Sequence, residues 1–293
     1  MIKDLIYPLA LFFGVACTPS IGVETPPIAN NGSLTKEKSI AQSNPAGLTI
    51  ATRFNAPQHY KRVMVEPNSF ANYLRNLPLK KEGSTVLYYD GSPKRNFMVY
   101  DAVVDLPIGK RDLHQCADAI MRLRGQYLYE QEEYDKIHFN FTNGFRVDYK
   151  EWMKGRRMVV KGNTTYWSSP GNPSNSPEDF WKYMELIFSY AGTLSLSKEL
   201  QPISLADLRI GDVFILGGTP GHAVIVVDMA RHVETGEKLF LLAQSYMPAQ
   251  ELQILANPLG NGVGSWYSED FGDQLMTPEW VFSAKQLMRF PSE

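Results

Sequence analysis

Three apolar runs in the last third of the chain constrain its fold more than any other feature. They cover residues 212–216, 222–228 and 239–244, and turn-forming residues separate them. The first two are joined by the short segment Gly-Gly-Thr-Pro-Gly at positions 217–221, which is typical of a hairpin connection. We therefore expect antiparallel strands that lie side by side in one sheet.

Helical periodicity appears earlier in the chain. Residues 69–77, 113–130 and 179–192 repeat their apolar positions every three or four residues, which predicts three amphipathic helices. Helices followed by an antiparallel sheet are typical of the α+β class, and we expect that class here. The remaining predictions are a short strand at 48–54, a strand–turn–strand unit at 85–89 and 97–104, and an irregular, aromatic-rich insertion at 138–177.

Charge and composition exclude several classes of protein. The chain of 293 residues has 29 Lys and Arg against 31 Asp and Glu, a net charge of −2, so no basic surface is expected to hold a nucleic acid. Two cysteines cannot build a disulfide-stapled scaffold. We expect no metal or cofactor, because His232-x-Glu234 lacks further ligands and the glycines at 260–264 follow no predicted strand.

The N-terminus has the pattern of a secretion signal. Residues 5–16 form an apolar run that is too short to span a bilayer, which takes roughly 20 residues. Residues 14–17, Gly-Val-Ala-Cys, resemble the bacterial lipobox, although Gly14 stands where that family usually has Leu. The resemblance implies a signal peptide at 1–17, lipidation of Cys17 and a membrane anchor, and Thr18 after the cysteine favours the outer membrane. The alternative is an ordinary cleaved signal peptide with a chance cysteine.

The segment that follows is expected to be a flexible linker. Residues 18–47 contain four prolines and few large apolar side chains, so they cannot bury enough surface to offset the entropy of ordering. Residues 48–293 then form the globular α+β domain. Within it, residues 48–110 are either a separate N-terminal lobe or part of the same domain, and the sequence leaves both open.

Cys116 is the one thiol expected inside the folded part. It lies at the start of the helix predicted at 113–130, where unpaired backbone N–H groups and the helix dipole favour a thiolate. The alternative is a packing role, because Cys116 shares an apolar stripe with Ala119, Ile120, Leu123 and Tyr127.

His222 opens the second strand of the predicted hairpin. The combination of Gln115-Cys116 on a helix, Gly211-Asp212-Val213 and Gly221-His222-Ala223-Val224 resembles the CHAP and NlpC-type cysteine amidohydrolases, which are papain-like enzymes. That resemblance implies a papain-like core, in which a helix carrying the cysteine packs on an antiparallel sheet and the histidine starts a strand. The two residues lie farther apart in this chain than in those families, so the aromatic-rich insertion must loop out.

The resemblance also implies roles for nearby residues. His222 would be the base for Cys116, and Gln244 on the next strand would orient the imidazole; Asp228 is too far along the strand, by about 20 Å, for that task. Gln115 or His114 would supply an oxyanion donor, and Ser245 is a further candidate for the cleft.

Two functions follow from these patterns. The first is an envelope-anchored cysteine peptidase or amidase whose substrate is a peptide, including the peptides of peptidoglycan. The second is a non-catalytic lipoprotein that keeps the fold as a binding module or a structural component of the envelope. Over its whole length the chain also resembles an uncharacterised family of Bacteroidetes-type lipoproteins, which implies a location and no activity.

Overall fold

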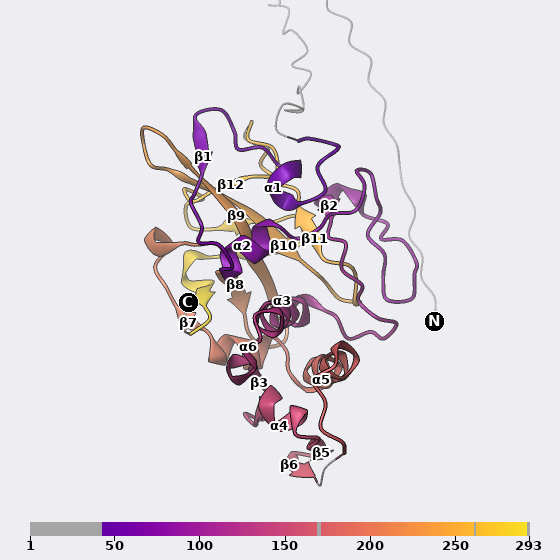
Figure 1. Cartoon of the computed structure of the whole chain (residues 1–293). Helices are drawn as coiled ribbons and strands as arrows, with labels where there is room; N and C mark the ends of the chain where they lie inside the picture. The colour runs from indigo at the N-terminus through magenta and orange to yellow at the C-terminus, as the bar shows by residue number, and fades with distance from the viewer. Residues whose placement is uncertain (1–42, 169–170, 261, 292–293) are drawn as a thin grey trace, which may run out of the picture. The chain divides into compact units, whose positions relative to one another are not determined.

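Antiparallel pairing joins nine strands into the main sheet of the protein, as the computed structural model shows for residues 43–168, 171–260 and 262–291 (Figure 1). The strands in these ranges are β1 (Tyr60–Arg62), β2 (Tyr100–Val103), β3 (His138–Asn140), β4 (Arg146–Asp148), β5 (Arg157–Lys161), β6 (Thr164–Ser168), β7 (Gln201–Pro202), β8 (Val213–Leu216), β9 (His222–His232), β10 (Lys238–Gln244), β11 (Gln253–Leu255), β12 (Tyr267–Ser268), β13 (Leu275–Met276), β14 (Val281–Phe282) and β15 (Leu287–Arg289). Of these, β3–β4, β5–β6 and β13–β14 are separate two-stranded sheets, and the others form the main sheet. The α-helices are α1 (Ile50–Arg53), α2 (Phe70–Arg75), α3 (Cys116–Glu130), α4 (Tyr149–Met153), α5 (Pro177–Tyr190) and α6 (Thr193–Glu199), and the short 3-10 helices are η2 (Phe97–Val99), η3 (Tyr134–Lys136), η4 (Leu205–Asp207) and η5 (Ala284–Gln286).

The main sheet is centred on β9 and β10. Its order is β2-β11-β10-β9-β8-β15-β7, with β1 also paired to β9 and β12 to β10, and every pair is antiparallel. All seven residues of β10 and the first nine of β9 are buried, because both faces of these strands are covered. The prediction of a mixed α+β protein with an antiparallel sheet is confirmed, and β8, β9 and β10 lie where the three apolar runs predicted strands.

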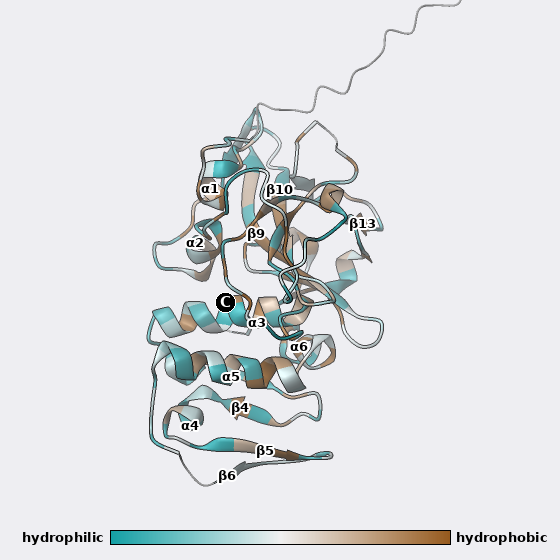
Figure 2. Cartoon of the chain, turned by 90° about the vertical axis from the view of Figure 1, so that its right-hand side faces the viewer, coloured by the Kyte–Doolittle hydropathy of each residue, from teal (hydrophilic) through white to brown (hydrophobic). Residues whose placement is uncertain are grey.

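Helix α3 packs against the sheet at β9, and α1, α2 and α6 also contact the sheet. Helix α3 itself contacts α2, α5 and α6 as well as β9 and β10. Figure 2 shows α3, α5, α4 and the β5–β6 hairpin following one another away from the sheet. Ser69 caps α2, and Ser176 followed by Pro177 starts α5, so two of the predicted helices begin at the expected kind of residue.

The region predicted as a strand at 48–54 is a helix. Thr49 accepts a hydrogen bond from the backbone of Thr52, and the Thr52 hydroxyl in turn accepts one from the Thr49 N–H, which is a capping box that starts α1. The local hydrogen bonds of these two threonines therefore outweigh the β-propensity of the segment.

Of the strand–turn–strand prediction at 85–89 and 97–104, the second strand is confirmed in part, as β2, and the first strand and the pairing are wrong. Residues 97–99 form the 3-10 helix η2, and β2 pairs with β11 rather than with 85–89. The turn itself is present, since the Gly91 N–H donates to the Tyr88 carbonyl. Residues 138–177, predicted as an irregular insertion, contain the β3–β4 and β5–β6 hairpins with α4 between them.

None of the helices in the described ranges is long and apolar enough to cross a membrane. The predicted signal peptide at 1–17, the predicted lipidation site Cys17 and most of the predicted linker at 18–47 lie outside the described residues.

Candidate functional site

Cys116 is the first residue of α3 and is partly exposed. Its sulfur faces three backbone N–H groups, those of Cys116 and Ala117 at the helix start and that of Ala223 in β9. Ala223 is the residue that follows His222, so the thiol lies against the beginning of the strand that carries the histidine. The structure therefore brings the helix start and the strand start together.

The pKa of the Cys116 thiol is raised to about 11, in contrast to the expectation of a stabilised thiolate. Burial of the sulfur is the main cause, and the nearby Asp118 carboxylate adds to it. The three N–H groups lower the pKa, as a helix N-terminus should, but their effect is smaller than that of burial. The thiol is consequently neutral around pH 7.

His222 is the first residue of β9 and is almost fully buried. Its Nε2 atom is 2.8 Å from Oε1 of Gln244, the last residue of β10. The rings of Tyr246, Trp280 and Phe282 surround the imidazole, with centroid separations of 4.8, 5.3 and 5.9 Å. The orienting contact expected of Gln244 is thus present in the structure, whereas within the described ranges Nδ1 of His222 forms no hydrogen bond.

The pKa of His222 is lowered to about 4. Burial is the main cause and the ammonium of Lys94 adds to it, while the hydrogen bond with Gln244 acts in the opposite direction. The imidazole is therefore neutral at physiological pH and has an unprotonated ring nitrogen that can accept a proton.

Two residues that the sequence did not point to continue this network. Nε2 of Gln244 donates to Oε2 of Glu279 at 2.6 Å, and Nζ of Lys94 lies 2.7 Å from the same oxygen. The side chain of Lys94 is only 3% exposed and that of Glu279 18%. The result is a continuous chain of contacts from His222 through Gln244 and Glu279 to Lys94.

The other predicted site residues have structural contacts of their own. The Gln115 amide donates to Asp112, and the Ser245 hydroxyl lies within 2.8 Å of the carbonyl oxygens of His114 and Gln250; in the described ranges neither side chain forms a hydrogen bond with His222. His114 is completely buried with its ring edge-on to Phe188, and the Gln250 carbonyl faces the ring without a well-aligned hydrogen bond.

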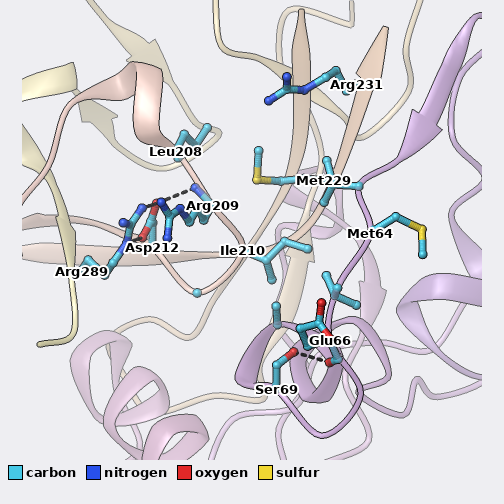
Figure 3. A pocket seen from close by; sticks show the side chains of 14 residues that line it. Met64, Glu66, Ser69, Leu208, Arg209, Ile210, Asp212, Met229, Arg231 and Arg289 are labelled. Carbon is cyan, nitrogen blue, oxygen red and sulfur yellow. Dashed lines mark hydrogen bonds and ion pairs between the residues drawn. The ribbon is translucent and has the colours of Figure 1, made fainter. Parts of the chain in front are cut away.

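A separate pocket of about 440 Å³ lies on another part of the sheet (Figure 3). It is lined by the apolar side chains of Val63, Met64, Ile210 and Met229 and by Arg209 and Arg231, among others. The one hydroxyl among its lining residues, that of Ser69, bonds the Glu66 carbonyl, and the carboxylate of Asp212 is paired with Arg289. This pocket has no cysteine or histidine in its lining, so the place where the Cys116 thiol meets the start of β9 is the better candidate for chemistry.

No cluster of three or more His, Cys, Asp or Glu side chains in the described ranges could hold a metal ion.

Neither the curated proteins nor the solved structures include a match to this chain. The family profile named domain of unknown function 4846 matches residues 50–289, which include α3 and the strands of the main sheet. The chain therefore belongs to the family of the domain of unknown function 4846.

Proposed function

We propose that this protein is a cysteine hydrolase of the papain-like type, which cleaves peptide or amide bonds with Cys116 as nucleophile. The observation that carries the proposal is the hydrogen bond between His222 and Gln244, made where the Cys116 thiol meets the start of β9. A nucleophile at a helix N-terminus, a histidine on a strand and a polar group behind the histidine are the three parts that such chemistry needs.

The reaction starts from two neutral groups. As the Cys116 sulfur attacks the substrate carbonyl carbon, its proton passes to Nδ1 of His222, because Nε2 is engaged by Gln244. The resulting imidazolium then donates that proton to the leaving nitrogen, the C–N bond breaks, and the amine departs, leaving the acyl group on Cys116 as a thioester. Water attacks the thioester with His222 as base, which releases the carboxylic acid and restores the thiol.

The backbone at the start of α3 offers donors for the oxyanion. The N–H groups of Cys116 and Ala117 belong to the first turn of the helix and have no partner within it. Fixed donors of this kind stabilise the negative charge of a tetrahedral intermediate, typically by about 3–4 kcal/mol for each donor. The side chains of Gln115 and His114 are not required for this step, and their contacts lead elsewhere.

The proposed substrate is a peptide of the bacterial envelope, with peptidoglycan peptides as the first choice. This part rests on the lipobox resemblance of residues 14–17 and on the amidohydrolase resemblance around Cys116 and His222. We propose further that the protein is anchored at the outer membrane through lipid on Cys17.

The test is hydrolysis of purified peptidoglycan by the full chain in detergent, followed by chromatography of released peptides and detection of new amino groups. Cys116→Ser should reduce release at least 100-fold while leaving the urea unfolding midpoint nearly unchanged. Ser69→Ala is the matched control, because it removes a hydroxyl from the separate pocket and should leave release intact. Activity that survives Cys116→Ser would refute the proposal.

The raised pKa of Cys116 favours a second candidate, a non-catalytic module that binds envelope peptides. A buried thiol that is neutral at pH 7 is what a packing cysteine shows. Under this alternative, sedimentation with peptidoglycan would retain the wild type and Cys116→Ser equally, and neither would release peptides.

A further inference from the structure

We propose that Glu279 is a positioning residue that acts through Gln244 to fix which ring nitrogen of His222 carries the proton. The consequence for catalysis rests on the proposed function, whereas the effect on the imidazole does not.

The carboxylate of Glu279 can only accept hydrogen bonds. A side-chain amide has one accepting end and one donating end, and either end can face a neutral partner. Because Oε2 of Glu279 lies 2.6 Å from the Gln244 amide, the NH₂ end must face Glu279. Oε1 of Gln244 is thereby turned towards His222, at 2.8 Å from Nε2.

Lys94 holds the Glu279 carboxylate in place. Its ammonium lies 2.7 Å from the same carboxylate oxygen, and the lysine side chain is nearly enclosed. A charge-assisted contact of this kind fixes the position of the oxygen that accepts from Gln244. The ring of Tyr246 lies beside the same ammonium, at 5.9 Å.

The orientation of Gln244 decides the state of the imidazole. An amide oxygen offers no proton, so Nε2 of His222 must carry one to form this hydrogen bond. The neutral ring is then protonated at Nε2 and has its lone pair at Nδ1, the nitrogen that the proposed reaction uses as base. Gln244 alone does not fix this state, because a rotated amide would donate to Nε2 and move the proton to Nδ1.

The experiment measures the tautomer directly by two-bond ¹H–¹⁵N NMR of the histidine rings in the full chain at pH 7.5. His222→Asn identifies the signals of His222. The wild type should show a protonated Nε2 and an unprotonated Nδ1. In Glu279→Gln the new amide can present either end to Gln244, so both tautomers should be populated and the two ¹⁵N shifts should move towards their average.

Two further variants make the test specific. Glu279→Asp keeps an acceptor-only carboxylate and should retain the wild-type tautomer. Glu251→Gln removes the carboxylate of another Lys–Glu pair, that with Lys80, and should also leave His222 unchanged. An unchanged tautomer in Glu279→Gln would overturn the proposal, and so would mixing of equal size in Glu279→Asp.

Kinetics separate this proposal from the proposed function. If wild-type protein hydrolyses peptides, Glu279→Gln should lower kcat about tenfold or more with little change in KM, and Glu279→Asp should restore most of the loss. If the tautomer changes as expected but wild-type protein hydrolyses nothing, the hydrolase proposal fails while the positioning role of Glu279 stands. Hydrolysis with an unaltered kcat in Glu279→Gln would refute its positioning role in catalysis.

Discussion

Nε2 of His222 lies 2.8 Å from Oε1 of Gln244, and each side chain is about 1% exposed. A buried polar pair of this kind depends on both partners, because loss of one leaves the other without water or a hydrogen bond. The two residues stand at the ends of neighbouring strands, so the contact also fixes the edge of the sheet against the candidate site.

Replacing Gln244 by Met should therefore destabilise the protein. The substitution keeps the length of the side chain but leaves the Nε2–H of His222 unpaired, at a cost of about 1–3 kcal/mol. Urea unfolding at pH 7.5 measures the change. Gln126→Met is the control, since this amide reaches Glu130 on the exposed surface of α3, and it should change the free energy of unfolding by less than about 0.5 kcal/mol. Equal losses of unfolding free energy in both variants would show that the buried pair stabilises the protein no more than the exposed contact does.

The reactivity of Cys116 should follow its raised pKa. In a Cys17→Ser chain, Cys116 is the single thiol, and its alkylation by iodoacetamide reports the thiolate fraction. Burial raises the pKa of this thiol to about 11, so the rate should increase nearly tenfold per pH unit from pH 7 to pH 10. At pH 7 it should be roughly 100-fold or more below that of an unperturbed thiol with a pKa of about 8.5. A rate that is already constant at pH 6 would instead indicate a preformed thiolate–imidazolium pair.

The sequence predicted those parts of the fold that depend on local periodicity. The apolar runs at 212–216, 222–228 and 239–244 correspond to β8, β9 and β10, and the stripe at 69–77 corresponds to α2. The helix predicted at 113–130 begins at Cys116, so the candidate nucleophile was expected within one turn of its actual place. Periodicity of this kind is set by burial of one face and needs no knowledge of distant contacts.

Contacts between distant loops could not be predicted in this way. Lys94 and Glu279 are 185 residues apart in the chain, and neither belongs to an apolar stripe or a motif. The pKa of Cys116 differs from the expectation for a related reason: a helix N-terminus is visible in the sequence, but the extent of burial that outweighs it is not. At 48–54 the sequence does contain a signal for a helix: threonines three residues apart, Thr49 and Thr52, can form the reciprocal hydrogen bonds of a capping box, which favour a helix start.

Asp228, which is too far from His222 to orient it, should instead be important for stability. Its carboxylate is completely buried and lies 2.6 Å from Nε of both Arg62 and Arg75. Asp228→Asn would leave two guanidinium groups without their counter-charge, and we expect a loss of about 3–5 kcal/mol in urea unfolding. Asp148→Asn breaks the exposed pair with Arg146 and should cost less than about 1 kcal/mol. A loss below 1 kcal/mol for Asp228→Asn would contradict the account.

Gly211, a buried residue just before β8, should tolerate no side chain. Its φ of +97° is one that L residues rarely adopt, and a Cβ there would stand 3.1 Å from the ring of Phe70. Gly211→Ala should therefore cost roughly 1–3 kcal/mol. Gly236→Ala is a matched control with a φ of +78° and open space around it, so the difference between the two variants isolates the contact with Phe70. Equal losses would show that backbone strain alone accounts for the effect.

His114 should make the protein less stable in acid. Burial, reinforced by the charge of Arg122, lowers the pKa of this imidazole to about 3, and neither ring nitrogen has a hydrogen-bond partner. Between about pH 6.5 and pH 3 the unfolded chain binds a proton that the folded chain excludes, so stability is full above this range and falls as the pH falls through it. His114→Phe removes this linkage and keeps an aromatic ring against Phe188, so the variant should gain about 3 kcal/mol relative to the wild type between pH 7 and pH 4 in urea unfolding. Parallel pH profiles for the two proteins would show that His114 titrates normally in the folded state.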